Sequence, residues 1–138
     1  QRVVQAATAM VGGGVSRARI GVWGAAFKPD SDDVRDSPAL WIAGQLHLRG
    51  AEVAVYDPKA NESARTRFPT LKYADNAVEA ARDADLVLHL TEWPEFREVD
   101  LGAVSDAVRR QQILDGRNVL DLDAWRSAGW VARGLGRR

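Results

Sequence analysis

The chain of 138 residues contains no cysteine. It can therefore form no disulfide or thiolate metal site, and it can supply no cysteine nucleophile. Its 19 Lys and Arg balance 19 Asp and Glu, so the summed charge offers no long-range attraction to nucleic acid or to an anionic membrane. No apolar run approaches the roughly 20 residues of a membrane helix, and no signal-peptide pattern is present. These absences favour a soluble, cytoplasmic protein with no nucleic-acid partner and no membrane partner.

The sequence has enough apolar residues, 46%, to build the core of one ordinary domain. An apolar pattern with helical spacing is already present at the start of the sequence, which indicates that the chain begins partway along a helix. The residues of this pattern are Val3, Val4, Ala7, Met10 and Val11. Three consecutive glycines at 12–14 predict the end of this helix and a flexible joint. We therefore expect residues 1–17 to be the end of an inter-domain connecting helix and 18–138 to be the domain proper. We also expect the opening helix to be poorly held, or to pack on a neighbouring molecule.

Strand patterns alternate with helix patterns along the rest of the chain. The expected strands cover 19–23, 52–56, 71–73, 84–90 and 112–114, and the expected helices cover 38–49, 61–68, 76–82 and 101–108. Most of these strands are apolar on both faces, which is typical of a parallel sheet covered by helices on both sides. The predicted fold class is α/β, with a Rossmann-like doubly wound parallel sheet.

Ligands of such sheets bind beyond the carboxyl ends of the strands, so the segments that follow strands deserve the closest inspection. The longest is 24–36, which lacks the G-x-G-x-x-G spacing of a dinucleotide site. It carries Lys28 and Arg35 against four aspartates, so an anion site here would have to use one of those two cations individually. From the residues alone, the alternative interpretation is that this segment is a solvated acidic loop followed by a Ser37 helix cap. Clustered aspartates can also bind Mg²⁺, but nothing else in the sequence resembles an oxygen cage.

Other polar and aromatic residues have simpler interpretations. Asp57 follows a strand where a Rossmann domain binds ribose, but Asp-Pro also starts turns, and we favour the turn. His47 and His89 have no partner at metal-ligand spacing, so we expect packed or surface roles for both. Trp41 and Leu48 add a second apolar edge to the helix at 38–49, which is explained either by a wider core or by contact with a part of the protein outside this chain or with another subunit.

Five segments, taken in order, resemble the C-terminal domain of the UDP-glucose/GDP-mannose dehydrogenase family. They are Gly24–Ala39, Val55–Pro58, Thr91–Trp93 with Phe96, Asp115–Asp121, and Gly129–Trp130 with Arg133–Arg137. The resemblance covers about residues 18 to 138, and the opening helix is similar to the tail of the family's inter-domain connection. Because five ordered segments agree, a chance match is a poor explanation.

The resemblance also implies roles for four residues. It places Phe27 and Lys28 against the UDP-sugar, brings Arg117 to the same ligand, and directs Arg35 to the diphosphate of NAD across a domain cleft. The side chains suit these roles, since Lys is a compact charge and Arg offers a planar fork for paired acceptors. A surface lysine and two surface ion pairs remain the alternative interpretation.

The family oxidises the C6 alcohol of a sugar nucleotide twice with NAD, through intermediates bound to a cysteine. This chain has no such cysteine, no glycine-rich NAD loop and no catalytic lysine segment. The resemblance therefore implies that it positions UDP-glucose, is inactive alone, and works with a missing N-terminal dehydrogenase domain in a homodimer. UDP-N-acetylmannosamine and GDP-mannose dehydrogenases are close alternatives. A stand-alone, non-catalytic nucleotide-binding module is an alternative of a different class.

Overall fold

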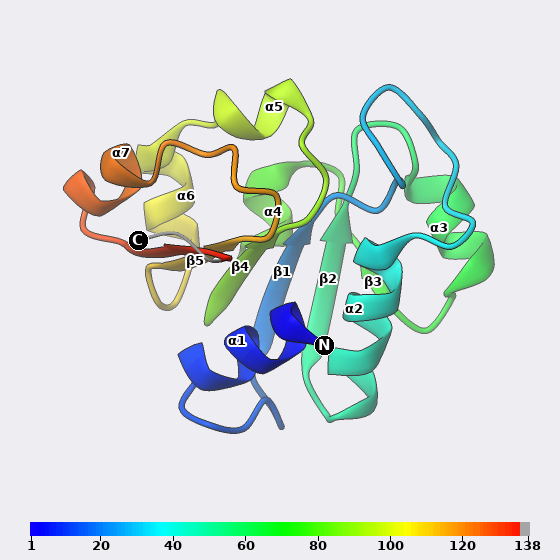
Figure 1. Ribbon diagram of the computed structural model, residues 1–138, viewed down its shortest axis with the longest axis horizontal. Coiled ribbons are helices and arrows are strands. Elements are labelled where there is room, and N and C mark those ends of the chain that lie inside the picture. The colour runs from blue at the N-terminus through cyan, green and yellow to red at the C-terminus, as the bar shows by residue number, and fades with distance from the viewer. Residues whose placement is uncertain (136–138) are drawn as a thin grey trace.

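The computed structural model describes residues 1–135, in which a single six-stranded parallel sheet forms the centre of the chain (Figure 1). Its strands are β1 (Arg19–Trp23), β2 (Glu52–Tyr56), β3 (Lys72–Tyr73), β4 (Leu86–His89), β5 (Gln112–Asp115) and β6 (Val131–Gly134). The strand order is β3-β2-β1-β4-β5-β6, and every neighbouring pair is parallel. The chain reverses its direction of winding between β1 and β4, so the predicted Rossmann-like doubly wound α/β fold is confirmed.

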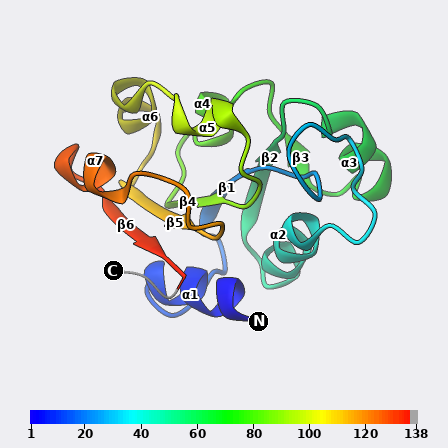
Figure 2. The same ribbon diagram turned by 45° about the horizontal axis from the view of Figure 1, so that its top comes forward.

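Helices cover both faces of the sheet and create two buried clusters (Figure 2). On one face lie α1 (Arg2–Met10), α2 (Pro38–Leu48) and α3 (Asn61–Arg67). On the other lie α4 (Ala77–Ala80), α5 (Pro94–Arg97), α6 (Leu101–Ala107) and α7 (Leu122–Ser127). Strand β4 illustrates the result, because Leu86 and Leu88 face the first cluster and Val87 faces the second. The continuous apolar runs of the sequence arise from this two-sided burial.

Helix α1 belongs to the core of this chain. Val3, Val4, Ala7 and Met10 are buried in the first cluster, and α1 packs against α2 and against β4 and β5. The expectation that this apolar stripe would find no partner within the chain is therefore wrong, because the sheet face between β4 and β5 needs a cover and α1 supplies it. Within residues 1–135, no helix has the length and apolarity to cross a membrane.

Candidate functional site

The candidate site lies at the carboxyl ends of the strands, where the segments after β1, β4 and β5 are joined by hydrogen bonds. The direction of winding reverses between β1 and β4, and ligands of doubly wound sheets bind outside the strand ends at this point. The segment after β1 carries Phe27, Lys28 and Arg35, and the segment after β5 carries Arg117. All four residues that the sequence analysis singled out therefore belong to loops of this one edge.

Asp57 fixes the base of the loop that follows β1. Its buried carboxylate accepts hydrogen bonds from the backbone N–H groups of Ala25 at 2.8 Å and Ala26 at 2.9 Å, and from the indole N–H of Trp93 at 3.1 Å. Its other oxygen accepts from the backbone N–H groups two and three residues further along the chain. The predicted turn at Asp57 is thus confirmed. The same side chain also holds together the segments after β1, β2 and β4, a role that the sequence did not reveal.

A close contact between Gly24 and Thr91 completes this base. The Thr91 hydroxyl donates to the carbonyl of Ala26 at 2.9 Å, and Gly24 has φ +109°. A Cβ at Gly24 would lie only 2.6 Å from the backbone nitrogen of Thr91, so a side chain at this position would clash with the end of β4. Ser37 closes the far end of the loop, since its hydroxyl donates to the Ala25 carbonyl at 2.6 Å and caps α2 as predicted.

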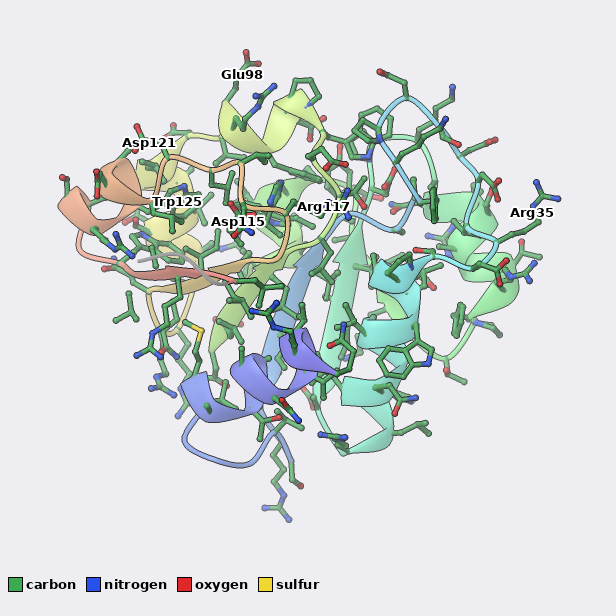
Figure 3. The ribbon with its side chains drawn as sticks, viewed as in Figure 1. Arg35, Glu98, Asp115, Arg117, Asp121 and Trp125 are labelled. Atoms are coloured by element: carbon green, nitrogen blue, oxygen red, sulfur yellow. The ribbon has the colours of Figure 1, made fainter. Side chains whose placement is uncertain are left out.

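Residues 27–36 project from this base and carry three of the predicted site residues. Phe27 is 53% exposed, and Lys28 is exposed as well. Arg35 pairs with Asp33 through two contacts of 3.2 Å, and its side chain is 76% exposed. Hydrogen bonds from Arg35 lower the pKa of Asp33, and the same pair raises the pKa of Arg35. Arg35 points away from the sheet, as Figure 3 shows, so its guanidinium is directed toward solvent and not toward the strand ends.

Asp115 organises the segment after β5. Its fully buried carboxylate accepts from the four consecutive backbone N–H groups of residues 117–120, at 2.9, 3.0, 2.7 and 2.7 Å. It also lies 2.8 Å from Nδ1 of His89. Burial alone would raise the pKa of Asp115, but the hydrogen bonds from His89, Leu120 and Arg117 outweigh it and hold the pKa well below its usual range. The carboxylate is therefore ionised and fixes the path of this turn.

Arg117 is held from two sides at the centre of the edge. Its backbone N–H donates to Asp115, while its Nε and Nη2 lie 2.9 and 2.8 Å from one oxygen of Glu92 in the segment after β4. The Arg117 side chain remains 39% exposed. Figure 3 shows Arg117 near the carboxyl ends of the central strands, whereas Arg35 lies on the far side of its loop. The structure thus brings Arg117 and Glu92 together and separates Arg35 from them.

Sequence inspection missed Glu92, the cross-link made by Asp57, and the pairing of His89 with Asp115. A partial signal exists, because Asp57 directly follows β2, Asp115 is the last residue of β5, and each precedes a turn residue. The partners of these aspartates come from strands distant in sequence, so only the register of the sheet reveals them. Gly136 and Arg137, which belong to the last segment of the family resemblance, lie outside the described residues.

Comparison with known proteins agrees with this geometry. Residues 21–122 match the sequence profile of the UDP binding domain of the UDP-glucose/GDP-mannose dehydrogenase family. Among curated proteins, UDP-glucose 6-dehydrogenase TuaD of Bacillus subtilis is 38% identical over 126 residues, which cover 91% of this chain and 27% of that enzyme. The chain thus spans only about a quarter of the length of this relative.

Two solved structures extend the agreement to the backbone. A UDP-glucose dehydrogenase from Pyrobaculum islandicum matches with a TM-score of 0.75 and 32% identity, over 94% of this chain and 27% of that one. An NDP-N-acetyl-D-galactosaminuronic acid dehydrogenase from Methanosarcina mazei matches with a TM-score of 0.79 and 28% identity, over 99% of this chain and 28% of that one.

Proposed function

This chain belongs to the UDP-glucose/GDP-mannose dehydrogenase family, as its UDP binding domain, and we propose that it binds and positions the nucleotide-sugar in an NAD-dependent UDP-glucose 6-dehydrogenase. The observation that carries the proposal is the placement of Arg117. Its guanidinium stands at the carboxyl edge of the sheet, is held by an ordered turn and by Glu92, and remains partly exposed. A planar cation held in this way suits the paired oxygens of a diphosphate.

Phe27 and Lys28 supply the second half of the proposed site. Lys28 is an exposed cation on the loop after β1, and among residues 1–135 no carboxylate lies within ion-pair distance of its amine. Phe27 presents an apolar face beside it, and its backbone N–H is fixed by the Asp33 carbonyl at 2.9 Å. Together they offer a charge for a phosphate and a surface for the uridine or the sugar, which is the role that the family resemblance assigns to them.

The bond-making groups would come from outside this chain. The sequence has no cysteine, and we propose that an N-terminal dehydrogenase domain supplies the nucleophile and most of the NAD site, in a homodimeric cytoplasmic enzyme. NAD would accept the hydride from the sugar alcohol. Arg35 fits a contact with the NAD diphosphate, because its side chain is largely exposed and directed away from the sheet. Residues 1–17, with α1, would be the end of the helix that joins the two domains.

Binding titrations of the full-length enzyme test the assignment of residues. A charge-assisted hydrogen bond contributes about 1.5 to 3 kcal/mol, so Lys28→Ala and Arg117→Ala should each weaken UDP binding roughly 10- to 100-fold. Arg35→Ala should chiefly weaken NAD⁺ binding. Lys72→Ala, an exposed lysine on edge strand β3, is the matched control and should change neither affinity. Unchanged UDP affinity in both the Lys28 and the Arg117 variants would remove the nucleotide-sugar site from this edge.

Two further measurements test whether catalysis requires a domain outside this chain and which sugar nucleotide is the substrate. The chain alone should form no NADH from UDP-glucose and NAD⁺, and activity in a preparation free of contaminating enzyme would overturn the proposal. An enzyme from Methanosarcina mazei that is named for another sugar nucleotide shares the fold closely. We propose UDP-glucose as the substrate, and a higher kcat/KM for UDP-N-acetylmannosamine or GDP-mannose in the full-length enzyme would assign the alternative instead.

A further inference from the structure

His89 is a buried polar side chain that the proposed function leaves unused. It is the last residue of β4 and stands directly opposite Asp115, the last residue of β5, in the register of the sheet. Both side chains are fully buried, and Nδ1 of His89 lies 2.8 Å from Oδ1 of Asp115. Within the part of the chain that the structure describes, Nε2 of His89 has no hydrogen-bond partner. An apolar residue would avoid the cost of that buried nitrogen, so the polar ring needs another explanation.

The direction of the bond follows from the other contacts of Asp115. Four backbone N–H groups donate to its carboxylate, which is ionised and can only accept. Nδ1 of His89 must therefore carry the proton and donate it to Asp115. The imidazole thus supplies one more donor to the carboxylate that shapes the turn at 116–120.

Two further contacts at the end of β4 also constrain the turn that carries Arg117. The His89 carbonyl accepts from the backbone N–H of Gly116 at 2.9 Å, which sets the first residue of the turn. Glu92, three residues further along, holds the guanidinium of Arg117. The end of β4 therefore controls Arg117 twice, through His89 and Asp115 at its backbone and through Glu92 at its side chain.

We propose that His89 is a positioning residue for the nucleotide-sugar site: by donating to Asp115, it fixes the turn that presents the Arg117 guanidinium to the ligand. This inference rests on the proposed function, because it assigns His89 a role in UDP binding through Arg117. The competing explanation is packing alone, since the His89 ring lies edge-on to Phe96 with centroids 5.7 Å apart. An aliphatic side chain of similar size could fill that space.

Two substitutions at His89 distinguish its role as a hydrogen-bond donor from its packing against Phe96. His89→Leu keeps an apolar contact with Phe96 but removes the donor, and His89→Asn places an amide N–H near the position of Nδ1. Loss of a hydrogen bond to a charged group is worth about a factor of 10, so His89→Leu should raise the UDP dissociation constant of the full-length protein by roughly that amount. His89→Asn should restore affinity to within about 2-fold. Equal affinities for wild type and His89→Leu would overturn the inference.

A double-mutant cycle shows whether His89 acts through Arg117. The effect of His89→Leu should disappear in an Arg117→Ala background, because no positioned guanidinium remains to be lost. An undiminished effect in that background would mean that His89 acts elsewhere. The controls also separate the two hypotheses: if Arg117→Ala alone leaves UDP binding unchanged, the proposed function fails, whereas if Arg117→Ala weakens binding and His89→Leu does not, only the role of His89 fails.

Amide hydrogen exchange gives a readout that needs no ligand. The backbone N–H groups of residues 117–120 should exchange faster in His89→Leu than in wild type, and His89→Asn should restore their protection. Residues 59 and 60, whose N–H groups bind Asp57, are an internal control and should be unaffected. Unchanged protection at 117–120 in His89→Leu would overturn the positioning role.

Discussion

The carboxyl edge of this sheet has two parts that both contain aspartates and their hydrogen-bond donors, but these groups are buried in one part and exposed in the other. In one part, Asp57 and Asp115 are buried, and each accepts several backbone N–H groups from neighbouring segments. In the other part, residues 27–36 form an exposed loop in which Asp33 pairs with Arg35 two residues away. The first part fixes where the backbone runs, and the second presents side chains to solvent.

The difference follows from burial. A buried carboxylate must be matched by donors. Removing a matched carboxylate is costly, because the N–H groups that donate to it then lose that acceptor. The exposed pair of Asp33 and Arg35 is screened by water and competes with it, so its formation changes little in the folded chain. Stability should therefore depend on the buried part, and ligand affinity on cations that are exposed.

The largest expected effect comes from removing Asp115. Asp115→Ala removes the carboxylate that accepts from the backbone N–H groups of residues 117–120 and pairs with His89, which should cost about 3 kcal/mol or more of the free energy of unfolding. Asp33→Ala is the matched substitution in the exposed loop and should leave the urea midpoint of unfolding unchanged. Urea titration followed by circular dichroism measures both. Similar midpoints for the two variants would contradict the distinction between the parts.

A pair of glycines sharpens the comparison at the level of the backbone. Gly24 and Gly12 both have positive φ, +109° and +92°, but only Gly24 approaches another segment, since a Cβ there would meet Thr91 and one at Gly12 would meet nothing within 4 Å. Gly24→Ala adds overlap to backbone strain and should destabilise by roughly 2 to 4 kcal/mol, whereas Gly12→Ala should cost about 1 kcal/mol. Thermal unfolding of both variants gives the difference. A smaller loss for Gly24→Ala than for Gly12→Ala would show that β4 can move away from the loop.

The contribution of Asp115 to stability should persist well into acid. The pKa of Asp115 is lowered in the folded state, so its contribution is fully present above the unfolded value of about 4 and is lost as the pH falls through the folded value. The difference in unfolding free energy between wild type and Asp115→Asn should therefore stay constant from about pH 7 to pH 5 and shrink only below about pH 4. Urea titrations across this range measure it. A decline of the difference between pH 7 and pH 5 would mean that Asp115 is not the titrating group.

The sequence predicted the fold well because local patterns carry it. The apolar runs at 19–23 and 84–90, the Ser37 cap and the alternation of strands with helices specified a doubly wound sheet. Strand β6, with the short helices α5 and α7, escaped prediction, because β6 buries only Ala132 fully and the two helices are too short for a periodic signal. The packing of helix α1 was predicted wrongly for another reason: its apolar stripe is visible in the sequence, but the face of β4 and β5 that it covers is not.

The candidate site, like the fold, could be predicted from the sequence only in part. The four predicted residues could be named because the two motifs that carry them, Gly24–Ala39 and Asp115–Asp121, are each continuous in sequence. Their assignment stays a prediction for the titrations above to test. The partners that hold Arg117 and its turn in place come from a distant part of the sequence: Glu92 follows β4, and His89, the partner of Asp115, ends β4. Strand order and register determine those pairs, and neither can be derived from a single amino-acid sequence.

The smallest expected effect concerns Glu92, the carboxylate that pairs with Arg117. Glu92 pairs with Nε and Nη2 of Arg117, one of the edges that the guanidinium offers for a bidentate contact, and its charge competes with that of a diphosphate. Glu92→Gln removes the competing charge but keeps an oxygen that can accept from the guanidinium, so UDP should bind about 2- to 5-fold more tightly, a change within the usual range for a partly exposed ion pair. The gain should diminish at high salt, because screening already weakens the pair there. Titration of UDP at low and at high ionic strength measures both effects. Weaker UDP binding in Glu92→Gln would instead show that Arg117 depends on the charge of Glu92 for its orientation, and would place Glu92 with Asp57 and Asp115 among the carboxylates that build the edge.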